Sequence, residues 1–165
     1  MLPARKGFDR TIGIAFLMFI ILGIPDGLLG IAWPSIREEF NLSLDAIGVF
    51  LLAFTLGFLV TSFNSGPLIQ RLGLARLLLI GCVVRGGAAL AILVAPSWAV
   101  MVALGAVFGA GTAVFDAGLN TYAATYQNNR LMNWLHASFG VGATVGPLLM
   151  TALFASGISW RWGYA

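Results

Sequence analysis

Four ionisable residues lie inside long apolar stretches of this sequence, and their side chains could exchange protons, form ion pairs or bind a solute: Asp26, Arg85, Asp116 and His136. An ionisable side chain at the centre of a membrane-spanning helix costs about 2.5 to 3.5 kcal/mol on insertion scales. Each of the four residues therefore needs a partner or a function that offsets this cost.

Asp26 lies in the segment Gly23-Ile24-Pro25-Asp26-Gly27. Helical rise places it about 22 Å along a helix that begins at Thr11, past the middle of a bilayer but still within it. Pro25 removes a backbone hydrogen bond and the two glycines permit a local break, and broken membrane helices form binding sites at this depth. We expect Asp26 to bind a solute or a proton; the alternative is a carboxylate that satisfies the break or pairs with a neighbouring helix.

Asp116 and Asn120 are four residues apart, so their side chains lie on one face of a helix. Together they could bind a hydroxylated or protonatable ligand, because the amide both donates and accepts hydrogen bonds. Asp116 stands about 27 Å along a helix that begins at Trp98, close to its far end. Ligand or proton binding and simple hydrogen bonding between helices are both open interpretations.

Arg85 lies about 16 Å along the third apolar stretch, so its depth matches that of Asp26 better than that of Asp116. It could form an ion pair there with either a structural or a functional role. His136 lies near the start of the fifth stretch, and imidazole is a common proton carrier. Ordinary hydrogen bonding is the alternative for His136.

The sequence does not indicate an enzyme, a cofactor or a metal site. No pairing of a nucleophile with a base and no cluster of metal ligands is evident, and neither aspartate has the Tyr-Asp or Gly-x-Gly-Asp context of intramembrane aspartyl proteases. The single cysteine, Cys82, allows no internal disulfide.

Membrane-spanning helices must position these residues. Hydrophobic residues make up 59% of the sequence and charged residues 9%, whereas soluble domains carry about 25% charged residues. Five apolar runs reach the length of about 20 residues that a membrane span needs: 11–33, 44–66, 74–94, 98–122 and 131–155. Short connectors, two of which begin at Pro34 and Pro67, make consecutive helices antiparallel neighbours. The sequence therefore predicts an all-α, polytopic membrane helix bundle.

Basic residues predict the orientation. Arg37 and Arg161 lie on one side of the predicted membrane, and more basic residues lie on the other: Arg5, Lys6, Arg10, Arg71, Arg76 and Arg130. Since basic residues concentrate on the cytoplasmic side, residues 1–10 are predicted to form a cytoplasmic tail of a multi-pass protein of the cell inner membrane. The same distribution argues against a nucleic-acid partner, because there is no basic stripe with interleaved aromatic residues.

The segment from Gly66 to Arg76 resembles the signature loop of the major facilitator superfamily. Gly66, Arg71, Gly73 and Arg76 match its glycine and basic positions, whereas Gln70 stands where the family usually has Asp. The resemblance implies a gating role for the four matching residues. It also implies twelve spans in two six-helix halves, of which this sequence would supply the first five, so the chain is expected to be a truncated half.

Two further resemblances concern the first, fourth and fifth spans. The segment from Gly142 to Pro147 is similar to a Gly-Pro motif of the fifth span in several branches of the superfamily. Asp26, and Asp116 with Asn120, resemble the acidic positions of fucose permease-like sugar:proton symporters. That resemblance implies roles in proton coupling and substrate binding for these three residues.

These features predict a secondary transporter that moves a small polar solute, a sugar by the resemblance, with coupling to protons by alternating access. The expected partners are the solute, protons, the lipid bilayer, and a missing C-terminal half or a second chain. The alternative is a membrane-embedded assembly or regulatory protein without transport activity, in which the polar residues only join helices.

Overall fold

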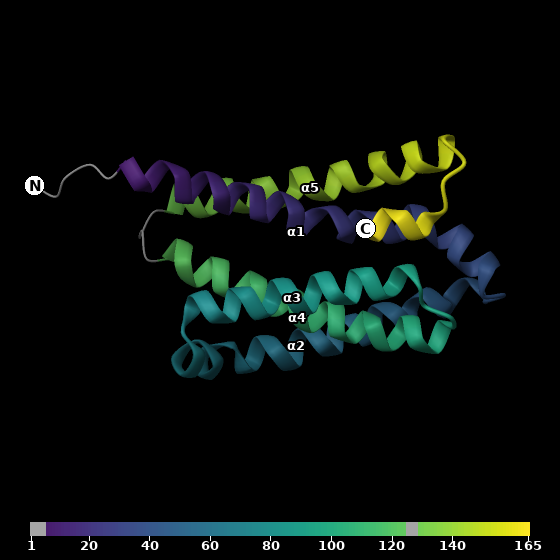
Figure 1. The fold of residues 1–165 in the computed structure, drawn as a ribbon, viewed down its shortest axis with the longest axis horizontal. Coiled ribbons are helices and arrows are strands. Elements are labelled where there is room, and N and C mark those ends of the chain that lie inside the picture. Colours follow the sequence, from purple (N-terminus) through teal and green to yellow (C-terminus); the bar gives the residue numbers. More distant parts are fainter. Residues whose placement is uncertain (1–5, 125–128) are drawn as a thin grey trace, which may run out of the picture.

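The computed structural model describes the backbone of residues 6–124 and 129–165, and the side chains from residue 12 onward within these ranges. The described chain is helical, without strands, and contains α1 (Lys6–Glu39), η1 (Leu44–Ala46), α2 (Ile47–Leu72), α3 (Leu74–Leu93), α4 (Trp98–Ala124), α5 (Asn129–Ala155) and η2 (Trp160–Tyr164) (Figure 1). Five of these helices are long and apolar enough to cross a membrane. The predicted all-α membrane helix bundle is confirmed.

α1 and α2 each run six residues past the end of the predicted span. α1 continues through Pro34 to Glu39, and α2 continues through Pro67 to Leu72. The predicted connectors that begin at these prolines are therefore largely helical. A proline removes one hydrogen bond, but the remaining backbone groups of an apolar segment are still best satisfied within the helix.

The five long helices form two groups. α1 packs mainly against α5, whereas α4 packs against both α2 and α3. Figure 1 shows α1 and α5 side by side, and α2, α3 and α4 together below them. The short helix η2 contacts α1, α3 and α5, so it joins the two groups at one end of the bundle.

Glycines bring α1 and α5 into backbone contact. A Cβ at Gly142 would overlap the carbonyl oxygen of Ile20, and a Cβ at Gly23 would overlap that of Phe139. Small residues at such positions let membrane helices approach closely. The expected break of α1 beside Asp26 is wrong: α1 is continuous from Lys6 to Glu39, and Gly23 packs against α5 instead of opening the helix.

Among the described residues, two clusters of buried apolar side chains lie at different depths. One cluster includes Leu28 of α1 and Met101 of α4, and the other includes Leu22 of α1 and Phe115 of α4. Asp26 lies between the two clusters along α1, and Thr112 lies between them along α4. Asp26 and Thr112 therefore lie at an intermediate depth of the bundle.

Candidate functional site

Asp26 and Arg85 form an ion pair between the two groups of helices. Nη2 of Arg85 on α3 lies 3.9 Å from Oδ1 of Asp26 on α1. The side chain of Arg85 is 10% exposed and that of Asp26 is 33% exposed. The arginine is therefore enclosed, while the carboxylate keeps access to the space beside it.

Arg85 has further partners that hold its guanidinium in place. Nη1 donates a hydrogen bond of 2.6 Å to the Thr112 hydroxyl, and Nη2 donates one of 2.6 Å to the backbone carbonyl of Leu22. The guanidinium carbon also lies 4.6 Å from the centre of the Phe108 ring. A buried charge needs partners of this kind, because an unpaired one is strongly destabilising.

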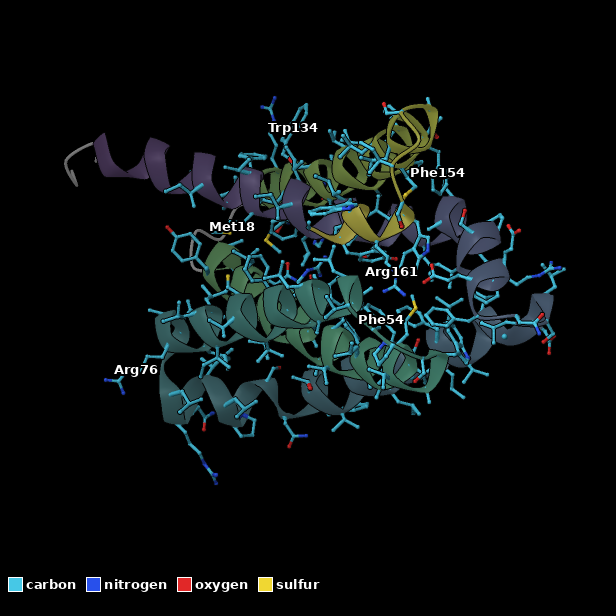
Figure 2. The ribbon with its side chains drawn as sticks, turned by 45° about the vertical axis from the view of Figure 1, so that its right-hand side comes forward. Met18, Phe54, Arg76, Trp134, Phe154 and Arg161 are labelled. Atoms are coloured by element: carbon cyan, nitrogen blue, oxygen red, sulfur yellow. The ribbon has the colours of Figure 1, made fainter. Side chains whose placement is uncertain are left out.

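The Asp26 carboxylate lines a cavity of about 240 Å³ that we call the Asp26 cavity. Its walls come from α1, α2, α4 and η2 and are mostly aliphatic or aromatic: Pro25, Asp26, Leu29, Phe50, Leu51, Phe54, Phe108 and Tyr164. Figure 2 labels Phe54 on α2, one of the rings of this wall. Tyr164 lies outside the five candidate spans, and burial together with the nearby Asp26 charge raises its pKa, so its phenol is a neutral hydrogen-bonding group.

A second cavity, of about 280 Å³, lies between α1, α3 and α4 and is lined by Arg85, Cys82 and Met18 among others. Met18 is labelled in Figure 2. Pro25 and Phe108 line both cavities. Because Asp26 lines one cavity and Arg85 the other, the ion pair lies between them.

Asp116, Asn120 and His136 form a separate polar group. The Asn120 side chain hydrogen-bonds the Asp116 carboxylate, and His136 of α5 interacts with it electrostatically. The ring of His136 packs edge-on against Phe19, at 5.6 Å between centroids. Asp116 stands two turns, about 12 Å, along α4 from Phe108, so this group is distinct from the Asp26 cavity. The structure therefore divides the predicted intramembrane residues between two places.

The residues of the predicted gating loop form a tight turn between α2 and α3. Gly66 lies within α2, Arg71 lies in its last turn, and Arg76 lies in the first turn of α3, with both arginine side chains exposed. Gly73 joins the helices with a φ of 77°, a conformation that glycine adopts without strain. The gating role of these four residues stays a prediction.

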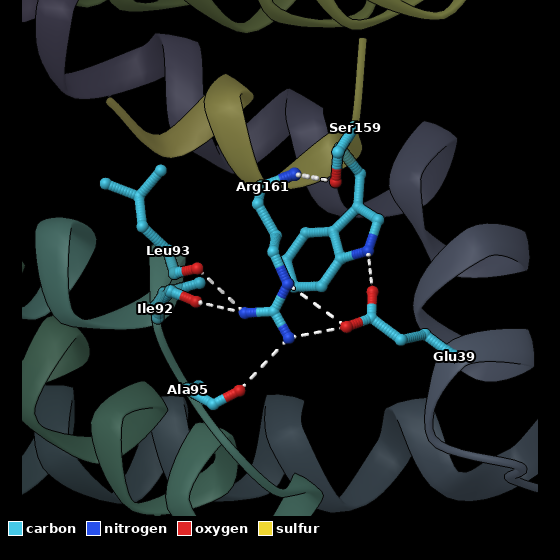
Figure 3. Close-up of polar contacts among 7 residues, drawn as sticks. Glu39, Ile92, Leu93, Ala95, Ser159 and Arg161 are labelled. Carbon is cyan, nitrogen blue, oxygen red and sulfur yellow. Dashed lines mark hydrogen bonds and ion pairs between the residues drawn. The ribbon is translucent and has the colours of Figure 1, made fainter. Parts of the chain in front are cut away.

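The sequence did not point to a polar cluster at the end of the bundle where η2 lies (Figure 3). Nη2 of Arg161 donates a hydrogen bond of 2.6 Å to Oε1 of Glu39, and the Trp160 indole donates one of 2.7 Å to Oε2. The guanidinium also donates to backbone carbonyls at the end of α3, those of Ile92, Leu93 and Ala95. In the sequence, Arg161 contributes only to the predicted orientation. The signal available there is the acidic pair Glu38-Glu39 together with the Trp160-Arg161 pair.

The sequence also did not single out the aromatic wall of the Asp26 cavity. Phe50, Phe54, Phe108 and Tyr164 come from three different helices and lie far apart in sequence. Aromatic residues in apolar runs look like ordinary core residues until the helices are assembled. Among the residues whose placement is described, no group of three His, Cys, Asp or Glu side chains is arranged to hold a metal ion.

Five apolar helices, with an ion pair that lies between two cavities, define a multi-pass membrane helix bundle. Residues 15–165 match the Major Facilitator Superfamily, and the chain belongs to that family. This family relationship, and the relatives below, link the chain to transport and resistance proteins and not to a family of enzymes.

Two known proteins, a transporter and a drug-resistance protein, are similar to the chain. The 4-hydroxybenzoate transporter PcaK of Pseudomonas putida is 25% identical over 144 residues, which cover 87% of this chain and 32% of that protein. The class G tetracycline resistance protein of Vibrio anguillarum is 28% identical over 152 residues, which cover 89% of this chain and 39% of that protein. The chain thus spans 32% and 39% of the lengths of these two relatives. No matching solved structure was found.

Proposed function

We propose that the chain is part of a secondary active transporter that moves a small organic solute by alternating access, with protons bound and released at Asp26. The observation that carries this proposal is the position of the Asp26 carboxylate, 3.9 Å from Arg85 and at the wall of a cavity of about 240 Å³. A carboxylate held between a charged partner and a cavity can gain or lose a proton when its surroundings change.

The other polar residues have supporting roles in this proposal. Arg85 positions Asp26 and stabilises its ionised form, since it is itself held by Thr112 and Leu22. Asp116, Asn120 and His136 provide a second place for a proton or a polar group of the solute, along the path towards the other membrane face. Two separated carboxylates then lie along one path.

The substrate and the orientation are further parts of the proposal. The relatives are named for an aromatic acid and for tetracycline, while the resemblance to fucose permease-like symporters adds a sugar as a candidate. We propose a cytoplasmic N-terminus, with the turn at Gly73 and its exposed arginines on the cytoplasmic side. Alternating access needs a second group of helices, which a C-terminal half or a second chain would supply.

The family and the relatives favour transport over an assembly or regulatory role without transport. The test uses the full-length protein in sealed vesicles that contain a pH-sensitive dye. Fucose, 4-hydroxybenzoate and tetracycline are added in turn, and internal pH and solute uptake are recorded together.

We expect one of the solutes to enter with a change in internal pH, and Asp26→Asn to abolish that change. Asp45→Asn is the matched control, since Asp45 lies in η1 and away from the cavity walls. Unchanged solute-driven proton movement in both Asp26→Asn and Asp116→Asn would remove these residues from the mechanism.

A further inference from the structure

The Asp26 cavity combines a single acidic group with several aromatic rings. Rings of Phe50, Phe54, Phe108 and Tyr164 line it, and its polar side chains are those of Asp26 and Tyr164. Arg85 lines the second cavity instead. A solute in the Asp26 cavity therefore meets one negative charge and a largely aromatic wall.

Both features favour a positively charged solute. The faces of aromatic rings carry negative electrostatic potential and attract cations, and such rings recognise substituted ammonium groups in proteins. The Asp26 carboxylate adds a formal counter-ion in surroundings where water screens charge poorly. The apolar part of the wall, from Pro25, Leu29 and Leu51, suits an apolar body attached to the cation.

Other solute classes fit the cavity less well. An anion would meet the Asp26 carboxylate, while Arg85 lines the second cavity and donates its hydrogen bonds to Thr112 and Leu22. At 3.9 Å, Arg85 forms an ion pair with Asp26 but no hydrogen bond, so the carboxylate oxygens remain open to a second cation from the Asp26 cavity. A sugar would find two polar side chains for its several hydroxyl groups. Buried hydroxyls without partners are costly, so a polyhydroxylated solute would bind weakly here.

We infer that the Asp26 cavity binds a small organic cation, an ammonium group on an aromatic or branched apolar body, with Asp26 as its counter-ion. This inference rests on the proposed function, because it takes the cavity of the proposed transporter as the solute site and names the class of solute. The compact volume of about 240 Å³ sets the size, that of a single substituted ring.

The test is equilibrium binding to the full-length protein in detergent, measured by calorimetry. The probes are benzyltrimethylammonium as the cation, benzyl alcohol as a neutral ring compound, phenylacetate as an anion, and fucose as a sugar. We expect the cation to bind at least about tenfold more tightly than each of the other three, because it alone satisfies both the carboxylate and the rings.

Variants separate the contributions of charge and rings. Asp26→Asn is expected to weaken cation binding at least about tenfold, whereas Asp26→Glu retains it because the charge is kept. Phe54→Leu is expected to weaken it about 2- to 30-fold, the range for one lost cation–ring interaction. Phe63→Leu is the matched control on α2, since Phe63 is 83% exposed and lies outside the cavity wall.

Tighter binding of fucose or phenylacetate, or cation binding that Asp26→Asn leaves unchanged, would overturn the inference. Thermal unfolding of each variant, with Asp26→Glu as the charge-retaining reference, separates loss of the site from loss of the fold. The inference fails alone if another solute drives Asp26-dependent proton movement while the cation does not bind. The proposed function fails alone if the cation binds through Asp26 but neither it nor protons cross the vesicle membrane.

Discussion

Arg161 of η2 and Glu39 of α1 are joined by two hydrogen bonds, of 2.6 and 3.1 Å, from the guanidinium to one carboxylate oxygen. The same guanidinium donates to carbonyls at the end of α3. The last carbonyls of a helix have no partner within the helix, and Arg161 supplies a donor to that of Leu93. The carbonyl of Ile92 also accepts from the backbone N–H of Ala95. One side chain thus connects the α1/α5 pair to the group of α2, α3 and α4.

This connection predicts a stability loss on Arg161→Gln. Several charge-assisted hydrogen bonds disappear, but Glu39 is 40% exposed and solvent screens its share, so we expect a decrease of about 2 kcal/mol in the free energy of unfolding. Thermal unfolding in detergent measures it. Arg37→Gln is the control, since Arg37 is an exposed residue in the last turn of α1. Equal unfolding temperatures for the two variants would contradict this role of Arg161.

The Asp26–Arg85 pair predicts an asymmetric response to substitution. Arg85→Met leaves the Asp26 carboxylate and the Thr112 hydroxyl without their cationic partner, and we expect a loss of about 3 kcal/mol. Asp26→Asn is expected to cost less, because Arg85 keeps Thr112 and Leu22 and because Asp26 is partly exposed. Unfolding of both single variants and the double variant gives the coupling energy. A larger loss for Asp26→Asn would mean that the carboxylate, not the arginine, organises the site.

The close contact of α1 and α5 predicts sensitivity at Gly146. A Cβ there would overlap the carbonyl oxygen of Ile24, so Gly146→Ala must push the helices apart and is expected to cost about 1 to 3 kcal/mol. Gly140→Ala on the same helix is the matched control, because a Cβ at Gly140 meets nothing within 4 Å. Unfolding temperatures of the two variants should differ clearly. Similar values would show that the helices accommodate a methyl group at this crossing.

The second polar group predicts a separation of coupling from binding. Asp116→Asn removes the acidic proton carrier beside Asn120 and His136, so we expect at least a tenfold loss in solute-driven proton movement in vesicles. Solute binding at the Asp26 cavity should be unchanged, because Asp116 does not line it. Calorimetry on the same preparation measures that binding. Loss of both activities together would place Asp116 in the solute site instead.

Much of the site could be predicted one residue at a time. Asp26 and Arg85 were recognisable because ionisable residues deep in apolar runs are costly and need a reason. The matching depths of the two residues followed from helical rise alone. The contact between Asp26 and Arg85 could not be predicted from depth alone, because depth does not determine towards which neighbour a side chain points.

The aromatic residues around the Asp26–Arg85 pair could not be predicted from the sequence, for a different physical reason. Phe50, Phe54 and Phe108 belong to runs that are apolar on every side. In a soluble protein the apolar stripe of a helix faces the core, so the sequence pattern identifies the inner face. In a membrane protein the face towards lipid and the face towards other helices can both be apolar. Periodicity therefore cannot distinguish a residue that lines a cavity from one that faces lipid.

The sequence by itself determined that the chain is a bundle of five apolar helices with a few costly polar residues, because bilayer thickness sets helix length and burial cost limits charge. The tertiary structure decided which helices pair and which polar side chains meet. Those contacts depend on close approach at glycines such as Gly23 and Gly142 and on partners from distant helices, such as Arg161 for Glu39. Such information resides in the packing of the whole chain and not in any one segment.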